Sequence, residues 1–248
     1  MSEERPHGRR RVYLMRHAEV SYVDPVTRRL RDPRTVDLTA EGERQAEAAR
    51  AALAATPLDR VVCSGLPRTR RTAGLVAAGR GLAVEDRPDL IEIRSGRLSD
   101  VPPERFDAEF VYGFEAAATP GARFAGGEAF AEFERRVVGA LEALLAEPGW
   151  RDALVVAHEG VNRMALAWAA GAGLAGLGAF DQDMACINVV DFDVADGLIV
   201  RRLLRTVNLT PYDPTKNGLH LTALERLART FRVLHPPAPA TSEDGATP

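Results

Sequence analysis

Arginine and histidine side chains follow short apolar runs at three places in the chain. Arg16 and His17 follow the run 12–15, Arg68 follows the run that ends at Cys63, and His158 ends a third run. The planar guanidinium of arginine matches phosphate oxygens in a bidentate manner, and its permanent charge stabilises a phosphoryl group during transfer. A neutral imidazole attacks phosphorus when an acceptor holds its other nitrogen. These residue types therefore indicate phosphoryl-transfer chemistry.

The same chemistry needs a carboxylic acid that protonates the leaving oxygen. Glu92 is the candidate because it lies in an otherwise apolar stretch, where desolvation raises the pKa of a carboxyl and keeps it protonated near neutrality. Glu19 and Glu159 are the alternatives. We expect these two to orient neighbouring groups by hydrogen bonding instead.

The positions of these residues depend on strands that alternate with helices. An apolar, strand-like run precedes each of these arginine and histidine positions, and amphipathic helical patterns lie between the runs. Thr39 is the expected N-cap of the first helix. We therefore predict an α/β fold, a three-layer sandwich with a central mainly parallel sheet, helices on both faces and a lid-like insertion. The carboxyl ends of its strands would collect the two arginines and two histidines at one edge, where ligands bind in such sheets.

The remaining elements follow from the same patterns. The helix after the insertion is expected over 128–146 and a further helix over 161–170. The runs 185–192 and 197–204 predict an antiparallel pair that closes the sheet, and 221–231 predicts a terminal helix.

The expected domain organisation is simple. Residues 1–10 are predicted to form a mobile N-terminal arm, residues 11–235 a single α/β domain with an insertion at about 94–127, and residues 236–248 a disordered tail rich in proline and small polar residues. His7 lies in the arm and receives no function.

Composition narrows the function class. The net charge of −3 shows no basic excess, so a nucleic-acid partner is not expected. Cys63 and Cys186 lie in separate apolar runs and are expected to be reduced core residues. A run of about 20 apolar residues is not found, so we expect no membrane span and a cytoplasmic protein. The oligomeric state stays open, and a homo-oligomer is compatible with the sequence.

Four ordered motifs make the chain resemble the histidine phosphatase superfamily, in its phosphoglycerate mutase-like branch. The motifs are Leu14-Met-Arg-His-Ala-Glu19, Leu38-Thr-Ala-Glu-Gly42, Ser64-Gly-Leu-Pro-Arg-Thr-Arg-Arg-Thr-Ala73 and Val155-Val-Ala-His158. The resemblance implies that His17 is the phosphorylated nucleophile, that Arg16, Arg68 and His158 bind the phosphoryl group, and that Glu92 is the proton donor. It implies a phosphomonoester hydrolase that acts on a small phosphorylated metabolite without metal or other cofactor.

Two other functions remain as alternatives. Glu92 is followed by Ile93-Arg-Ser-Gly96 and not by the Tyr-Gly-Gly segment of true mutases, which weakens phosphoglycerate mutase-type transfer. A non-catalytic module that binds phosphorylated ligands would need neither His17 nor Glu92. A metal site is disfavoured because the histidines show neither a close pair nor a His-Glu-x-x-His pattern.

The substrate class is the least determined property. Residues 106–133 hold six phenylalanines and follow Glu92, so as a lid they would favour phosphate esters with an apolar or ring-bearing portion. The alternative is that these rings pack the insertion onto the sheet. The arginine-rich loop from Arg28 to Arg34 favours instead a second anionic group on the ligand, or is simply an exposed charged loop.

Overall fold

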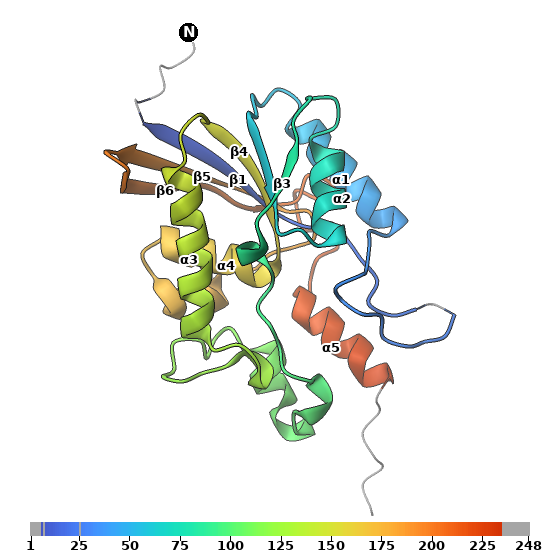
Figure 1. Cartoon of the computed structure of the whole chain (residues 1–248). Helices are drawn as coiled ribbons and strands as arrows, with labels where there is room; N and C mark the ends of the chain where they lie inside the picture. The colour runs from blue at the N-terminus through green and yellow to red at the C-terminus, as the bar shows by residue number, and fades with distance from the viewer. Residues whose placement is uncertain (1–5, 7, 25, 235–248) are drawn as a thin grey trace, which may run out of the picture.

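A six-stranded mixed sheet forms the centre of the computed structural model, which describes residues 6, 8–24 and 26–234 (Figure 1). The strand order is β3-β2-β4-β1-β5-β6, and the first four of these are parallel to one another. β5 runs antiparallel to both of its neighbours, as the sequence predicted for the closing pair. The strands are β1 (Arg9–Arg16), β2 (Arg60–Cys63), β3 (Val84–Asp86), β4 (Asp152–Ala157), β5 (Ile187–Ala195) and β6 (Leu198–Leu209).

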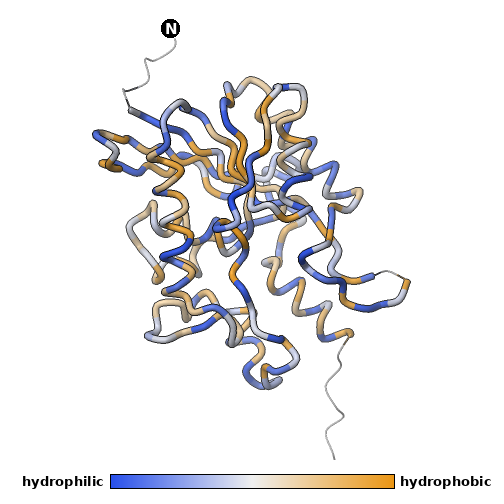
Figure 2. The backbone as a smooth tube through the Cα atoms, viewed as in Figure 1, coloured by the Kyte–Doolittle hydropathy of each residue, from blue (hydrophilic) through white to orange (hydrophobic). Residues whose placement is uncertain are grey.

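Helices cover both faces of this sheet, which confirms the predicted fold class (Figure 1). The α-helices are α1 (Ala40–Ala52), α2 (Pro67–Val76), α3 (Phe130–Ala146), α4 (Glu159–Ala169) and α5 (Ala223–Leu234). Successive side chains of a strand point to opposite faces. Val12 and Leu14 of β1 therefore join the core under α3 and α4, whereas Tyr13 and Met15 join the core under α1 and α2. Figure 2 shows hydrophobic stretches in the strands at the centre of the molecule.

Local signals explain where several elements begin. The hydroxyl of Thr39 accepts a hydrogen bond from the backbone N–H of Gly42 at 3.0 Å and so caps α1, as predicted. Pro67 occupies the first position of α2, where a missing N–H costs nothing. The tight turn between β5 and β6 has positive φ at Asp196 and Gly197, the geometry that two-residue hairpin turns require.

Some boundaries differ from the predictions. β1 begins at Arg9, inside the segment 1–10 that was predicted to be a mobile arm, because Arg9 makes a bidentate ion pair with Asp193 of β5 at 2.6 and 2.9 Å. α3 begins at Phe130 and not at residue 128, and α4 begins at Glu159, two residues earlier than expected. Most of the predicted arm, His7 included, and the predicted tail 236–248 lie outside the described residues.

The insertion between β3 and α3 consists of short helical turns. These are the 3₁₀ helices Pro88–Leu90, Leu98–Asp100, Pro103–Arg105 and Phe124–Gly126 and the π-helix Asp107–Val111; a longer 3₁₀ helix, Gly173–Ala179, follows α4. The six phenylalanines of the region 106–133 are all buried in one hydrophobic cluster. Five of them, all but Phe133, have neighbouring ring centroids 5.0–6.2 Å apart. α5 docks on this cluster, since Phe231 stacks on Phe106 at 5.2 Å. The packing alternative is therefore the correct one for most of these rings.

Candidate active site

The predicted arginines and histidines meet at the carboxyl ends of the parallel strands. Arg16 is the last residue of β1 and His17 follows it, His158 follows β4, and Arg68 lies in the first turn of α2 after β2. The ring centroids of His17 and His158 are 5.3 Å apart, and Nη2 of Arg68 lies 3.3 Å from Nδ1 of His158. All four side chains are at least nine-tenths buried. Segments more than 140 residues apart in the chain thus form one cluster.

The hydrogen bonding of His17 leaves one ring nitrogen free. Its Nδ1 lies 2.8 Å from the backbone oxygen of Ala18. A carbonyl oxygen only accepts, so Nδ1 carries the proton and Nε2 keeps its lone pair. Burial lowers the pKa of His17 well below its usual value, and the charge of Arg68 lowers it further. His17 is therefore neutral at pH 7, the state that a nucleophile needs.

His158 has the opposite tautomer. Its Nδ1 accepts a hydrogen bond from Arg68, which only donates, so the proton resides on Nε2. Nε2 then donates to Oγ of Ser64 at 2.8 Å, and a chain of hydroxyls continues through Thr69 to the backbone oxygen of Leu66. Burial lowers the pKa of His158 well below its usual value, with Arg68 as the second cause. His158 is thus a neutral, fixed side chain beside His17.

Both arginines keep a buried donor that no protein group accepts. Arg16 donates from Nη1 to the backbone oxygen of Gln182 at 2.5 Å, and Arg68 donates from Nη1 to that of Pro33 at 2.5 Å. The Nε atoms of both arginines are buried and have no hydrogen-bond partner among the described residues. An unpaired buried donor on a charged group is costly. The arrangement suits an anion that accepts from both guanidinium groups.

Glu92 lies against the beginning of α4. Its Oε1 accepts hydrogen bonds from the backbone N–H groups of Ile93 at 2.9 Å and Gly160 at 3.0 Å. Burial raises the pKa of Glu92, and the neighbouring carboxylate of Glu159 raises it further. A Cβ atom on Gly160 would lie 2.6 Å from Oε1 of Glu92, so only glycine permits this contact. Glu92 is thus a half-buried carboxyl whose surroundings favour its protonated form, compared with a free glutamate.

The two alternative acids have structural partners. Glu159 bridges two guanidinium groups, with Oε2 at 3.3 Å from Arg16 and Oε1 at 2.9 Å from Arg163. Glu19 accepts a hydrogen bond from the hydroxyl of Thr39 at 2.8 Å, next to the N-cap of α1. Both contacts fit the orienting role that the sequence suggested.

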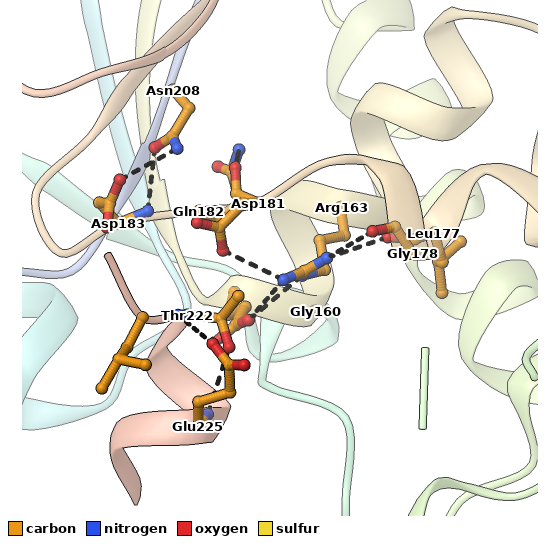
Figure 3. Close-up of polar contacts among 12 residues, drawn as sticks. Gly160, Arg163, Leu177, Gly178, Asp181, Gln182, Asp183, Asn208, Thr222 and Glu225 are labelled. Atoms are coloured by element: carbon orange, nitrogen blue, oxygen red, sulfur yellow. Dashed lines mark hydrogen bonds and ion pairs between the residues drawn. The ribbon is translucent and has the colours of Figure 1, made fainter. Parts of the chain in front are cut away.

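Arg163 was missed in the sequence. Besides Glu159, it pairs with Asp181 at 3.2 Å and donates to the backbone oxygen of Leu177 at 3.2 Å, as Figure 3 shows. It lies one turn after Glu159 on α4, and that spacing was the one signal available for it.

Two buried amides that were missed in the sequence fix the backbone oxygen that binds Arg16. The amides of Gln182 and Asn188 are fully buried and pair with each other at 2.8 and 3.2 Å. Asn188 also donates to the backbone oxygen of Leu14 in β1 at 3.0 Å. The backbone at Gln182, which accepts from Arg16, is thereby fixed to the sheet. Neither amide lies in a recognisable motif, so the sequence carried no signal for them.

Two of the four arginines in the loop 28–34 are already paired with nearby aspartates. Arg31 pairs with Asp24 at 2.9 Å and Arg34 with Asp32 at 2.6 Å, and all four arginines of the loop are exposed. The interpretation as an exposed charged loop therefore holds for their side chains. The loop still reaches the site through the backbone oxygen of Pro33.

Most of the chain is similar to known proteins. The profile of the histidine phosphatase superfamily (branch 1) matches residues 12–203. The chain belongs to this superfamily. A relative from Yersinia enterocolitica, named "Probable phosphoglycerate mutase GpmB", is 32% identical over 149 residues, which cover 59% of this chain and 68% of the relative.

Two solved structures extend the comparison. The alpha-ribazole phosphatase from Shigella flexneri superposes with a TM-score of 0.63 at 28% identity and covers 80% of this chain and 96% of its own. A mycobacterial glucosyl-3-phosphoglycerate phosphatase superposes with a TM-score of 0.63 at 25% identity, and the match covers 81% of this chain and 99% of that phosphatase.

Among the helices of residues 6–234 that are described, none is long and apolar enough to cross a membrane. Within the same residues, His, Cys, Asp and Glu do not gather in a group of three that could hold a metal ion.

Proposed function

We propose that this chain is a metal-independent phosphomonoester hydrolase that forms a phosphohistidine on His17. The observation that carries the proposal is a neutral His17 with a free Nε2, placed among two arginines whose buried Nε atoms lack an acceptor. A phosphoryl group between them would satisfy both donors and face the nucleophile. The superfamily to which the chain belongs, and relatives named as phosphatases, support the same chemistry.

Two steps make up the proposed reaction. The lone pair on Nε2 of His17 attacks phosphorus, the phosphorus–oxygen bond to the alcohol breaks, and the leaving oxygen takes the proton of Glu92. Water then attacks the phosphohistidine, gives its proton to the Glu92 carboxylate and releases phosphate and neutral His17. Arg16 and Arg68 bind the phosphoryl oxygens in both steps, and their charges stabilise the transition states. His158 holds Arg68 in place by accepting a hydrogen bond from its Nη2.

Phosphoryl transfer of the mutase type is the second candidate, and the similarity to the relative from Yersinia favours it. A mutase must hold a second anionic group of its substrate. Of the arginines that follow Glu92, Arg94 and Arg136 already share one carboxylate, that of Glu128, at 3.3 and 2.9 Å. This pairing favours hydrolysis.

Replacement of the nucleophile tests the proposal. We expect His17→Ala to lower kcat for p-nitrophenyl phosphate by roughly 10³-fold or more, whereas His220→Ala, which changes an exposed histidine, should keep full activity. Circular dichroism checks that both variants fold. A chelator should leave the wild-type rate unchanged. Turnover that survives in His17→Ala, or that stops with the chelator, would exclude this mechanism.

A further inference from the structure

A small cavity lies beside the proposed active site, between the insertion, α4 and the beginning of α5. Its volume is about 110 Å³. The side chains that matter for its chemistry are Tyr112, Phe114, Glu115, Arg163, Asp181 and Glu225. We call it the side cavity. Figure 3 shows its polar walls, with Arg163 and Asp181 on one side and Glu225 on the other.

Contacts place the side cavity next to the general acid. The ring of Phe114 lines the cavity, and its Cζ lies 3.2 Å from the position that a Cβ on Gly160 would take. The N–H of the same Gly160 binds Oε1 of Glu92. Arg163, another wall residue, is linked to Arg16 through the two oxygens of Glu159. The cavity therefore lies next to the glycine that binds Glu92 and is connected to Arg16 through Arg163 and Glu159.

The walls of the side cavity carry an excess of negative charge. Three carboxylates, those of Glu115, Asp181 and Glu225, face a single guanidinium, that of Arg163. Arg163 is already shared, because it pairs with Glu159 as well as with Asp181. Burial raises the pKa of Asp181, and the charge of Glu159 raises it further, as expected where negative charge is in surplus.

The cavity walls are also fixed in place. Glu225 accepts from the backbone N–H of Thr222 at 2.7 Å and its own N–H donates to the hydroxyl of Thr222 at 3.2 Å, a capping box that begins α5. Phe106 and Phe231 stack where α5 meets the insertion. A preformed cavity with carboxylate acceptors, a tyrosine and an aromatic ring suits a group that offers hydrogen-bond donors.

We propose that the side cavity binds the leaving group of the substrate and selects alcohols that carry no negative charge and present hydrogen-bond donors. The proposal rests on the proposed function and names its substrate class. An anionic leaving group, such as that of a phosphoglycerate or a bisphosphate, meets like charges there and is disfavoured. Polyols and amino alcohols share the favoured chemistry.

Two substrates that differ at one carbon test the selection. Glycerol 3-phosphate has a hydroxymethyl group where 3-phosphoglycerate has a carboxylate. We expect kcat/KM to favour glycerol 3-phosphate by about tenfold or more, because the surplus of carboxylates on the cavity walls repels the carboxylate of 3-phosphoglycerate; this ratio corresponds to about 1.4 kcal/mol. Equal values, or a preference for 3-phosphoglycerate, would overturn the proposal.

Substitutions of the cavity carboxylates test whether the cavity causes the preference for glycerol 3-phosphate. Glu115→Gln and Asp181→Asn each remove one wall charge and should narrow the ratio of kcat/KM between the two substrates. Glu104→Gln is the matched control, since it removes an exposed charge of the insertion outside the cavity lining and should leave the ratio unchanged. A ratio that stays the same in both cavity variants would overturn the proposal even if glycerol 3-phosphate is preferred.

A second pair separates the two kinds of favoured alcohol. A higher kcat/KM for 2-aminoethyl phosphate than for ethyl phosphate assigns the cavity to amino alcohols, and equal values with glycerol 3-phosphate preferred assign it to polyols. Turnover of p-nitrophenyl phosphate by the wild type and its loss in His17→Ala report on the proposed function separately. If the enzyme turns over p-nitrophenyl phosphate through His17 but does not prefer glycerol 3-phosphate, only the cavity proposal is overturned.

Discussion

At the scale of single residues, the site is defined by protonation states that burial imposes. His17 and His158 are kept neutral because the buried site disfavours their charged forms and two arginines lie beside them. Glu92 is shifted the other way, because burial and Glu159 disfavour its carboxylate. One environment therefore favours the neutral form of both histidines and the protonated form of the carboxyl.

Glu92→Gln tests the role of the acid. An alkyl phosphate needs a proton on its leaving oxygen, whereas an activated aryl phosphate does not. We expect kcat for ethyl phosphate to fall by roughly 10²-fold or more and kcat for p-nitrophenyl phosphate by less than about tenfold. Glutamine keeps an oxygen for the N–H groups of Ile93 and Gly160, so the fold should remain. An equal fall in kcat for both esters would mean that another group donates the proton, and Glu19 and Glu159 would be the next candidates to test.

At the scale of elements, the beginning of α4 connects the sheet to the acid. Gly160→Ala should push Glu92 from its place, because the new Cβ meets Oε1 of Glu92 at 2.6 Å and the ring of Phe114 at 3.2 Å. We expect the same loss on ethyl phosphate as in Glu92→Gln, and a free energy of unfolding lower by about 1–3 kcal/mol from overpacking.

Gly139→Ala is the matched control for this helix substitution. Gly139 lies within α3, and no atom lies within 4 Å of a Cβ built there. Its replacement should raise the free energy of unfolding by up to about 1 kcal/mol and leave activity unchanged. Urea denaturation and steady-state rates measure both effects. Full activity of Gly160→Ala on ethyl phosphate would show that α4 does not position the acid.

The sequence was sufficient for the elements whose signals are local. The apolar runs within β1 and β4 are followed by polar side chains, so the positions of Arg16 and His158 were predictable, as was the cap at Thr39. The contact between Gly160 and Glu92 joins segments 68 residues apart, and the paired amides of Gln182 and Asn188 lie in no motif. Such contacts depend on how distant elements pack, which periodicity does not encode.

The predicted lid shows the same limit. Its six phenylalanines were visible in the sequence, but whether they face a ligand or each other depends on tertiary packing. They form a buried cluster, and of these rings only Phe114 also lines the side cavity.

At the scale of the whole molecule, the buried histidines link stability to pH. Their pKa values are lowered on folding, so below about 6.5 the unfolded chain binds protons that the folded chain does not. Their contribution to stability is complete above that pH and is lost as the pH falls. Each histidine contributes a slope of up to about 1.4 kcal/mol per pH unit in that range.

Urea denaturation at several pH values measures this linkage. The free energy of unfolding should fall between pH 7 and pH 5, in roughly the range where unfolded histidine titrates. His17→Gln should show a smaller fall, because one of the two buried histidines is gone. A wild-type stability that does not change over this range, or a variant with an undiminished slope, would mean that these histidines become protonated within the folded protein.

The central claim is that turnover passes through a phosphorylated His17, and trapping that intermediate tests it most directly. The enzyme is mixed with a phosphate ester, quenched in alkali within milliseconds, where phosphohistidine survives, and digested for mass spectrometry. The account predicts a burst of phosphate on the peptide that contains His17, absent in His17→Ala and present in His220→Ala. Turnover at the wild-type rate without any phosphopeptide, or with the phosphate on His158, would contradict it.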